Sequence, residues 1–146
     1  RLLRTHWEAV DQGATSAGRT ADRSKWRIAR NVFVGETTRE AREFVLAGTM
    51  ARDYRDYLLR LLPKVKMLDL TKVDPDMADA DVTLEYMLDN IWVVGSPDDV
   101  TAQLQQLYDD VGGFGTLLAM GHEWEPKQPW LNSMRLLKEE VLPRLP

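Results

Sequence analysis

The chain of 146 residues is long enough for one domain, and its 44% hydrophobic and 29% charged residues exclude global disorder. A net charge of −4 gives no excess of positive charge for binding nucleic acid or an anionic membrane. The sequence has no cysteine and only two histidines, which excludes disulfides and Cys- or His-rich metal sites. No apolar run approaches the roughly 20 residues that cross a bilayer, and the start lacks the apolar core of a signal peptide, so a cytoplasmic location is expected.

The first part of the chain predicts a helix, a loop and a strand. Apolar residues recur at helical spacing over residues 2–11, whereas residues 11–25 are rich in Gly, Ser, Thr and Asp and are typical of a loop. Residues 26–34 carry apolar side chains that alternate and then become continuous, which predicts a strand that ends at Gly35. Because the chain opens at Arg1, without Met and already inside a helical pattern, we expect a piece of a longer or processed protein.

A helical segment follows the first strand. Thr37 and Glu40 form a capping-box pattern, in which the Thr37 hydroxyl accepts from the start of the helix and Glu40 reaches back. An apolar stripe at approximate helical spacing then continues as far as Pro63. Gly48 weakens the middle of this stripe, so the pattern is compatible with one helix or with two.

The helical segment is the first part of a longer excursion. Residues 64–78 are irregular, and residues 79–88 predict another helix, so that residues 39–90 form a helical excursion between the first two strands. In a barrel, a long segment of this kind often carries substrate recognition; otherwise it packs on another chain. The side chains suited to either role are Met50, Tyr54, Tyr57, Met67 and Met87.

The second strand and its helix have the clearest signals in the sequence. Residues 91–94 are continuously apolar, as expected of a strand covered on both faces, and Gly95 ends the run. Ser96 as a cap and Pro97 at the first helical position then predict a helix start, and Gly112 predicts its end. The buried stripe of this helix is predicted to consist of Val100, Leu104, Leu107, Tyr108 and Val111.

A third strand and a last helix complete the pattern. Residues 114–120 predict a strand that ends at Gly121, and a turn leads to a helix over residues 129–145. Trp124 and Trp130 flank this turn and suit either an aromatic lid over a pocket or packing of the last helix, with packing favoured. The inner face of the helix is predicted to consist of Trp130, Met134, Leu137 and Val141.

Strands that alternate with helices predict an α/β fold with a parallel sheet of about three strands. Three strands alone leave two open edges, and a closed eight-stranded (β/α)₈ barrel takes about 250 residues. The sheet is therefore expected to be incomplete as a barrel, completed by absent sequence or by a partner. A small self-sufficient α/β domain is the alternative.

Three stretches, taken together, resemble the C-terminal end of the bacterial-luciferase-like flavin-dependent monooxygenases. Residues 26–41 resemble the sixth strand of their barrel and the start of its helix. Residues 94–100, Val-Gly-Ser-Pro-Asp-Asp-Val, are similar to the stretch after the seventh strand, and residues 112–124 to the eighth strand and the turn beyond it. The order and spacing also match, so the resemblance spans nearly the whole chain, 1–146, and identifies it as the C-terminal portion of a TIM barrel.

The resemblance implies an enzyme that binds reduced FMN, supplied by a separate flavin reductase, and uses dioxygen to oxygenate a small organic substrate. Related members use a deazaflavin instead. Most flavin contacts in such enzymes come from the first five strands, so the chain alone is expected to hold no cofactor and to be inactive. Its partner is then the missing N-terminal part of the barrel or another copy of itself, and a non-catalytic, self-associating remnant is the alternative.

Active-site residues of such barrels lie at the C-terminal ends of the strands. His122 is the candidate catalytic residue, because a neutral imidazole can hydrogen-bond a ligand or move a proton; a structural histidine of the turn is the alternative. Gly95, Ser96 and Gly121 are the candidate cofactor-binding residues, although Ser96 also suits simple helix capping. Two further residues occupy the same end of the first strand, Gly35 and Glu36.

Overall fold

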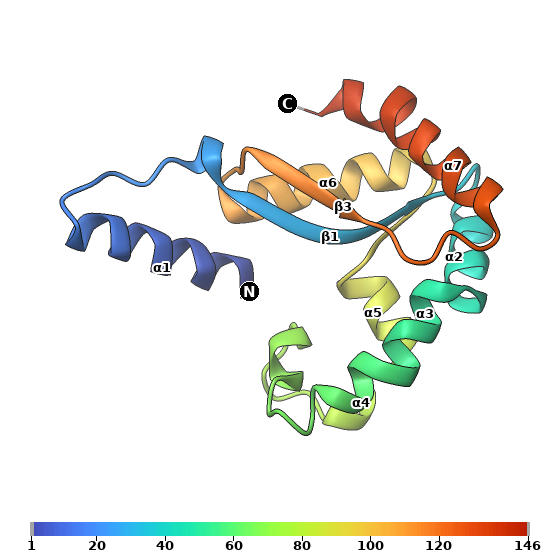
Figure 1. The fold of residues 1–146 in the computed structure, drawn as a ribbon, viewed down its shortest axis with the longest axis horizontal. Coiled ribbons are helices and arrows are strands. Elements are labelled where there is room, and N and C mark those ends of the chain that lie inside the picture. The colour runs from blue at the N-terminus through green and yellow to red at the C-terminus, as the bar shows by residue number, and fades with distance from the viewer. Residues whose placement is uncertain (1, 146) are drawn as a thin grey trace.

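In the computed structural model, which describes residues 2–145, a three-stranded parallel sheet runs through the chain in the order β2-β1-β3 (Figure 1). β1 (Arg27–Val34) is central and is the longest of the three strands. Its last three residues pair with β2 (Val93–Gly95), and its first five pair with β3 (Thr116–Met120). The predicted α/β class with about three parallel strands and open sheet edges is therefore confirmed.

The strands do not lie side by side in chain order, because β1 rather than β2 is in the middle of the sheet. The Gly35 amide donates to the Gly95 carbonyl at 3.0 Å, whereas the Trp26 carbonyl on the opposite edge accepts from the segment before β3. The reason is length: β2 joins β1 only where β1 extends beyond the last residue of β3.

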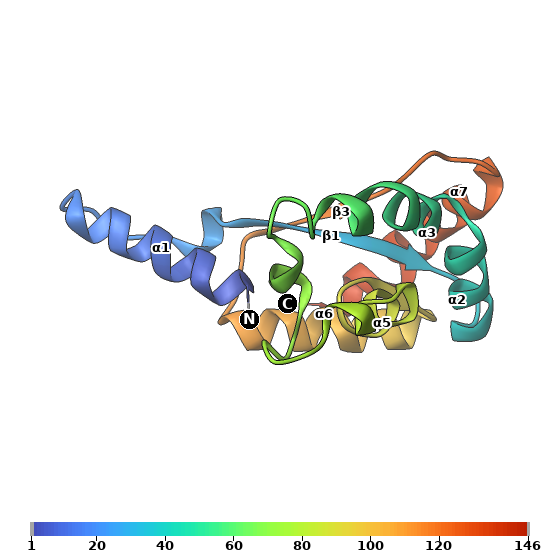
Figure 2. The same cartoon turned by 90° about the horizontal axis from the view of Figure 1, so that it is seen from below.

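The first helix is longer than the sequence predicts. α1 (Leu2–Ser16) includes residues 11–16, which were expected to be part of a loop. It lies at one end of the molecule beside the start of β1 (Figures 1 and 2). The ring of Trp7 packs on Trp26 at 5.3 Å between centroids, and the Arg23 guanidinium lies 4.2 Å from the centre of the Trp7 ring. This aromatic and cationic contact joins α1 to the sheet.

The excursion begins as the capping pattern predicts. Thr37 accepts from the Glu40 amide at 3.2 Å, and the helix breaks at Gly48, so two helices are present rather than one. The later helix begins at Leu84, five residues after its predicted start at Asp79, and the Thr83 hydroxyl caps it by accepting from the Tyr86 amide. The elements of the excursion are α2 (Thr38–Ala47), α3 (Thr49–Asp53), the π-helical turn η2 (Tyr54–Leu58), α4 (Leu59–Leu61), the 3₁₀ turns η3 (Leu68–Thr71) and η4 (Asp79–Asp81), and α5 (Leu84–Asn90).

The two helices after the excursion flank one side of the sheet. α6 (Pro97–Val111) has the predicted Ser96 cap and ends at Gly112 in the left-handed conformation, with φ of 73°. α7 (Lys127–Leu136) continues into the π-helical turn η5 (Leu137–Val141) and the 3₁₀ turn η6 (Leu142–Arg144).

The buried side of α7 differs in part from the prediction. Trp130 and Val141 are buried as expected, but Met134 is 50% exposed and its prediction as a core residue is wrong. Ser133 and Leu136 are buried instead. The helix meets the sheet along a stripe rotated away from Met134, which places a serine rather than a methionine against β1.

The two faces of the sheet have different surroundings. Val32 and Val34 of β1 pack against α6 and α7 in one hydrophobic cluster, which defines the outer face. The opposite, inner face consists of Ala29, Asn31 and Phe33 of β1 with Leu118 and Met120 of β3, because side chains alternate along a strand. Only its end near Phe33 is covered by the excursion, so Leu118 and Met120 remain 49% and 47% exposed.

Candidate functional site

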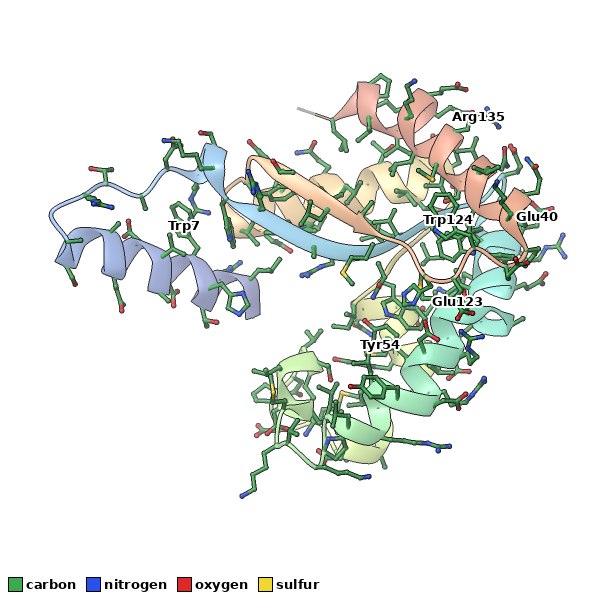
Figure 3. All side chains as sticks on the ribbon, in the orientation of Figure 1. Trp7, Glu40, Tyr54, Glu123, Trp124 and Arg135 are labelled. Atoms are coloured by element: carbon green, nitrogen blue, oxygen red, sulfur yellow. The ribbon has the colours of Figure 1, made fainter. Side chains whose placement is uncertain are left out.

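Four side chains form a polar cluster at the C-terminal ends of the strands on the inner face. Asn31 projects from β1, and His122 lies two residues beyond Met120 of β3, on the same face. Asp53 ends α3, and Tyr54 begins η2 of the excursion. Figure 3 shows Tyr54 on the excursion and Glu123, which follows His122, on the same side of the sheet. We call Asn31, Asp53, Tyr54 and His122 the inner polar cluster.

Hydrogen bonds join the inner polar cluster into a chain. His122 Nδ1 lies 2.8 Å from Asp53 Oδ2, and His122 Nε2 lies 3.0 Å from Asn31 Oδ1. Asn31 Nδ2 lies 2.6 Å from the Tyr54 hydroxyl. The His122 side chain is only 11% exposed. Hydrogen bonding from His122, and then from Arg52, holds the pKa of the Asp53 carboxyl below its ordinary value.

An ion-pair layer surrounds the cluster. The Arg52 guanidinium lies 3.0 Å from Asp53 and 2.9 Å from Glu123, and Thr49 donates to the Glu123 carbonyl at 3.0 Å. These contacts, first the one with Glu123, raise the pKa of the Arg52 guanidinium. Since the partners are substantially exposed, the pairs orient the turn against α3 more than they stabilise the fold.

The position of Tyr54 depends on a local change in the helix. α3 ends at Asp53, and the next turn is π-helical, a geometry frequently found at functional sites. The Tyr54 ring packs edge-on against buried Trp92, with 4.8 Å between centroids and 72° between planes. The Gly48 break directs α3 across the sheet, so both Asp53 and Tyr54 face the strand ends.

Of the predicted site residues, His122 and Gly121 lie at the cluster. A side chain at Gly121 would come 3.1 Å from Trp124 Nε1, so the glycine permits a close approach of this indole. Trp124 is 42% exposed, whereas Trp130 is buried edge-on against Phe33 at 5.1 Å. The packing role predicted for this aromatic pair is confirmed for Trp130.

Gly95 and Ser96 lie on the other side of β1 from His122, at the start of α6. The Ser96 hydroxyl accepts from the Asp99 amide at 3.3 Å and lies 3.0 Å from its carboxylate, which also bonds Thr38. These contacts, first the one with Thr38, lower the pKa of Asp99. A side chain at Gly95 would come 2.8 Å from Asp99 Cβ. The Asp99 carboxylate occupies the place that a phosphate at this helix start would take.

The other two positions at the end of β1 have packing and surface roles. A side chain at Gly35 would meet Ala41 of α2 at 3.0 Å, so this glycine allows α2 to pack closely on the strand end. Glu36 accepts from Asn132 at 3.0 Å and lies 3.4 Å from Arg135 of α7.

Sequence reasoning missed Asn31 and Asp53. Asn31 has a recognisable signal, since it is a polar residue at an inner position of an otherwise apolar strand end. Asp53 has none, because it is one of many acids in the excursion. Tyr54 belonged to the aromatic and methionine group that was expected to recognise substrate or pack on another chain. In that group Met50 and Met87 are core residues, whereas two others are exposed, Tyr57 and Met67.

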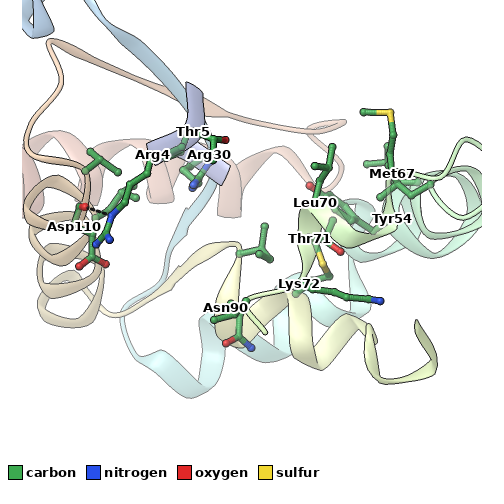
Figure 4. A pocket seen from close by; sticks show the side chains of 18 of the residues that line it. Arg4, Thr5, Arg30, Tyr54, Met67, Leu70, Thr71, Lys72, Asn90 and Asp110 are labelled. Carbon is green, nitrogen blue, oxygen red and sulfur yellow. Dashed lines mark hydrogen bonds between the residues drawn. The ribbon is translucent and has the colours of Figure 1, made fainter. Parts of the chain in front are cut away.

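A cavity of about 630 Å³ lies between α1, the excursion and the open side of β1 (Figure 4). Tyr54 and Arg30 both line it, together with apolar side chains of the excursion. Burial lowers the pKa of the Arg30 guanidinium there. Within residues 2–145, no group of three or more acidic or histidine side chains is arranged to hold a metal ion, and no helix is long and apolar enough to span a membrane.

Comparison with known proteins supplies the context for this site. No family model matches the chain. It is 34% identical over 144 residues to a 3,6-diketocamphane 1,6-monooxygenase of Pseudomonas putida, covering 98% of the chain and 38% of the relative. It is 29% identical over 145 residues to a limonene 1,2-monooxygenase of Rhodococcus erythropolis, covering 97% of the chain and 34% of the relative.

A solved structure shows the same arrangement. It is a type II Baeyer–Villiger monooxygenase, the oxygenating constituent of 3,6-diketocamphane monooxygenase from Pseudomonas putida, in complex with FMN. It matches with a TM-score of 0.89 and 34% identity, over 99% of this chain and 40% of that one. The monooxygenase RslO1 of Streptomyces bottropensis, 20% identical with a TM-score of 0.65, shows the likeness of fold alone.

These relatives are monooxygenases of the luciferase-like flavin-dependent family, and one of them is solved in complex with FMN. Over nearly its whole length the chain is similar to their C-terminal part. It spans about 40% of the length of the relatives that it matches.

Proposed function

We propose that this chain is the C-terminal portion of an FMN-dependent monooxygenase that uses reduced flavin and dioxygen to oxygenate a small organic substrate. One observation carries the proposal: 34% identity and a TM-score of 0.89 to an FMN-bound monooxygenase over 99% of the chain. The inner polar cluster lies at the C-terminal strand ends, where barrels of this class place their active sites. The chain alone is proposed to be inactive, because the remaining strands of the barrel would supply most of the flavin site.

The residues present fit one part of FMN and not the other. The exposed inner-face side chains Leu118 and Met120 form an apolar surface suited to a flat ring, next to His122 and Gly121. The phosphate does not fit at Ser96, where it would meet the Asp99 carboxylate. When bound, FMN supplies the redox chemistry with dioxygen; the inner face would support the ring and keep water from it. FMN is proposed over a deazaflavin because the solved relative is in complex with FMN.

The partner proposed for this chain is the rest of the barrel. Within the part of the chain that the structure describes, β3 has a partner strand on one edge only, and the first half of β1 is likewise unpaired on the side of β2. Apolar side chains are exposed on α7 and its continuation beside the open edge of β3, namely Met134 and Leu142. Unpaired strand edges and exposed apolar side chains are what further strands and helices of a barrel would cover. A flavin reductase and a small organic substrate are the other proposed partners.

The decisive experiment compares two proteins: this chain and the longest product that its gene encodes. FMN binding is followed by flavin fluorescence, and the intact mass of each protein is measured in parallel. Binding by the longer product alone supports the proposal. Binding by the 146-residue chain itself would overturn its proposed inactivity, and no binding by either protein would overturn the assignment to a flavin enzyme.

The second candidate is a non-catalytic remnant that associates with itself through the same open edges. The exposed edge of β3 favours it, because an unpaired edge is a template for pairing. Sedimentation of the isolated chain at increasing concentration tests it. A discrete dimer that binds no flavin would favour this candidate, whereas a monomer that associates only with the rest of the barrel would exclude it.

A further inference from the structure

Both ring nitrogens of His122 face oxygen atoms. Asp53 Oδ2 lies on the Nδ1 side at 2.8 Å, and Asn31 Oδ1 lies on the Nε2 side at 3.0 Å. A neutral imidazole has only one N–H and can donate to only one of them. Donation from both ring nitrogens in this arrangement requires two ring protons, with the Asp53 carboxylate as the counter-ion of the ring.

The same atoms also suit a neutral ring if the Asn31 amide turns over. After this rotation the Asn31 NH₂ group donates to His122 Nε2. The Asn31 oxygen then takes the position of the present NH₂ group and accepts from the Tyr54 hydroxyl. His122 keeps its Nδ1 proton on Asp53 in both arrangements. Loss of one proton from the ring thus reverses both remaining hydrogen bonds of the chain.

We propose that the inner polar cluster is a relay in which the protonation of His122 sets the direction of the Tyr54 hydroxyl. With His122 charged, Tyr54 accepts from Asn31, and its own O–H is free to donate outward. With His122 neutral, the Tyr54 O–H donates to the Asn31 oxygen, and the hydroxyl can offer only its lone pairs to a group on its other side. Asp53 and Asn31 are positioning residues of this relay.

Tyr54 lines the cavity of about 630 Å³. In the charged state the hydroxyl can therefore donate to an acceptor such as the carbonyl oxygen of an apolar molecule. In the neutral state it can only accept. The relay concerns side chains of this chain alone, so it is tested without flavin, and its failure is distinguishable from failure of the proposed function.

The charged and titratable groups around His122 come from three elements. α3 contributes Asp53 and Arg52, η2 contributes Tyr54, and the turn after β3 contributes Glu123. β1 contributes the uncharged Asn31 beside the ring, and Arg30 of the same strand lines the cavity with Tyr54 and interacts with it electrostatically. Arg52 bridges Asp53 and Glu123, so the one carboxylate in contact with the ring stays ionised while the ring titrates.

The test is a pH titration by NMR on the full chain with ¹⁵N-labelled histidine and tyrosine labelled at Cζ. We expect the His122 ring nitrogens and the Tyr54 Cζ to change over the same pH interval. The exposed residues His6 and Tyr57 are internal controls, and Tyr57 should not follow His122. Tyr54→Phe assigns the signal.

Two variants make the result decisive. Leucine at position 31 cannot pass on a hydrogen bond. In Asn31→Leu the His122 ring signals should still change with pH, while the Tyr54 Cζ chemical shift should stay constant over that pH interval. In Asp53→Asn, the imidazolium loses its counter-ion, so the His122 interval should move to lower pH and the Tyr54 interval should move with it. Two outcomes overturn the relay. One is a Tyr54 Cζ shift that does not change over the pH interval of His122 in the unmodified chain. The other is a Tyr54 interval that remains the same when Asp53→Asn shifts the His122 interval.

Discussion

The backbone amide of Val34 donates to the Ser133 hydroxyl of α7 at 2.8 Å. The serine thus takes the place of a strand partner for β1 beyond the point where the pairing with β3 ends. Both groups are buried. A buried N–H needs a partner, and here the pairing with β3 ends before Val34, so the Ser133 hydroxyl supplies it. The bond therefore joins α7 to the strand end that also anchors the excursion.

Ser133→Ala removes this partner and leaves the Val34 amide unsatisfied. We expect the free energy of unfolding to fall by about 1–3 kcal/mol, the cost of an unpaired buried donor. Chemical denaturation followed by circular dichroism measures the change. Asn132→Ala, which removes only exposed hydrogen bonds with Glu36 and Arg135, is the control and should change stability by less than about 0.5 kcal/mol. Equal effects of the two variants would contradict the prediction.

Stability should depend on pH through Asp53. The pKa of its carboxyl is lowered in the folded chain, chiefly by His122, so the stabilisation is present above the ordinary value of 3.8 and is lost as pH falls through the lowered value. Denaturation of the unmodified chain and of Asp53→Asn should therefore differ at pH 6 and converge in strong acid. Asp56→Asn, in the next turn, is the matched control, since Asp56 pairs only with exposed Arg55. A difference that persists unchanged below pH 3 would argue against this role.

Two glycine substitutions should have opposite signs. Gly95→Ala places a methyl group 2.8 Å from Asp99 Cβ and should destabilise the chain by about 1–3 kcal/mol, since the start of α6 must move. Gly13→Ala, in exposed helix α1 with nothing within 4 Å, should stabilise it by about 0.5–1 kcal/mol. Thermal unfolding compares the two. If Gly95→Ala is neutral, the close approach of Asp99 is not a constraint.

Ser96→Ala separates the capping role from the cofactor role of this residue. Loss of the cap should cost about 1 kcal/mol of stability and leave FMN affinity of the longer gene product unchanged. Fluorescence titration with FMN gives the second value. Ser96→Thr retains a capping hydroxyl and serves as the control for stability. A fall in affinity with Ser96→Ala, at unchanged fold, would instead show that Ser96 contacts the cofactor.

The elements with local signals were predictable. The Ser-Pro start and glycine end of α6 lie where the sequence places them, because caps and breakers act within a few residues. The strand order was not predictable in the same way, since pairing of β1 with both other strands depends on their lengths and not on local pattern. Of the inner polar cluster, the sequence indicated Tyr54, as one of a broader aromatic and methionine group, and His122. Its partners Asn31 and Asp53 are 91 and 69 residues away in sequence, and tertiary packing alone brings them together.

The parallel pairing of β1 with β2 has a consequence for how this part of the fold can change. The excursion leaves at Gly35, after β1, and returns before Val93, which pairs with Val32, so its two ends are held close by the sheet. Lengthening or replacing a segment whose ends are already close costs little extra entropy, because closure entropy grows only logarithmically with length. A transplanted segment of different size, joined after Gly35 and before Val93, can therefore reshape this end of the sheet while all three strands stay the same.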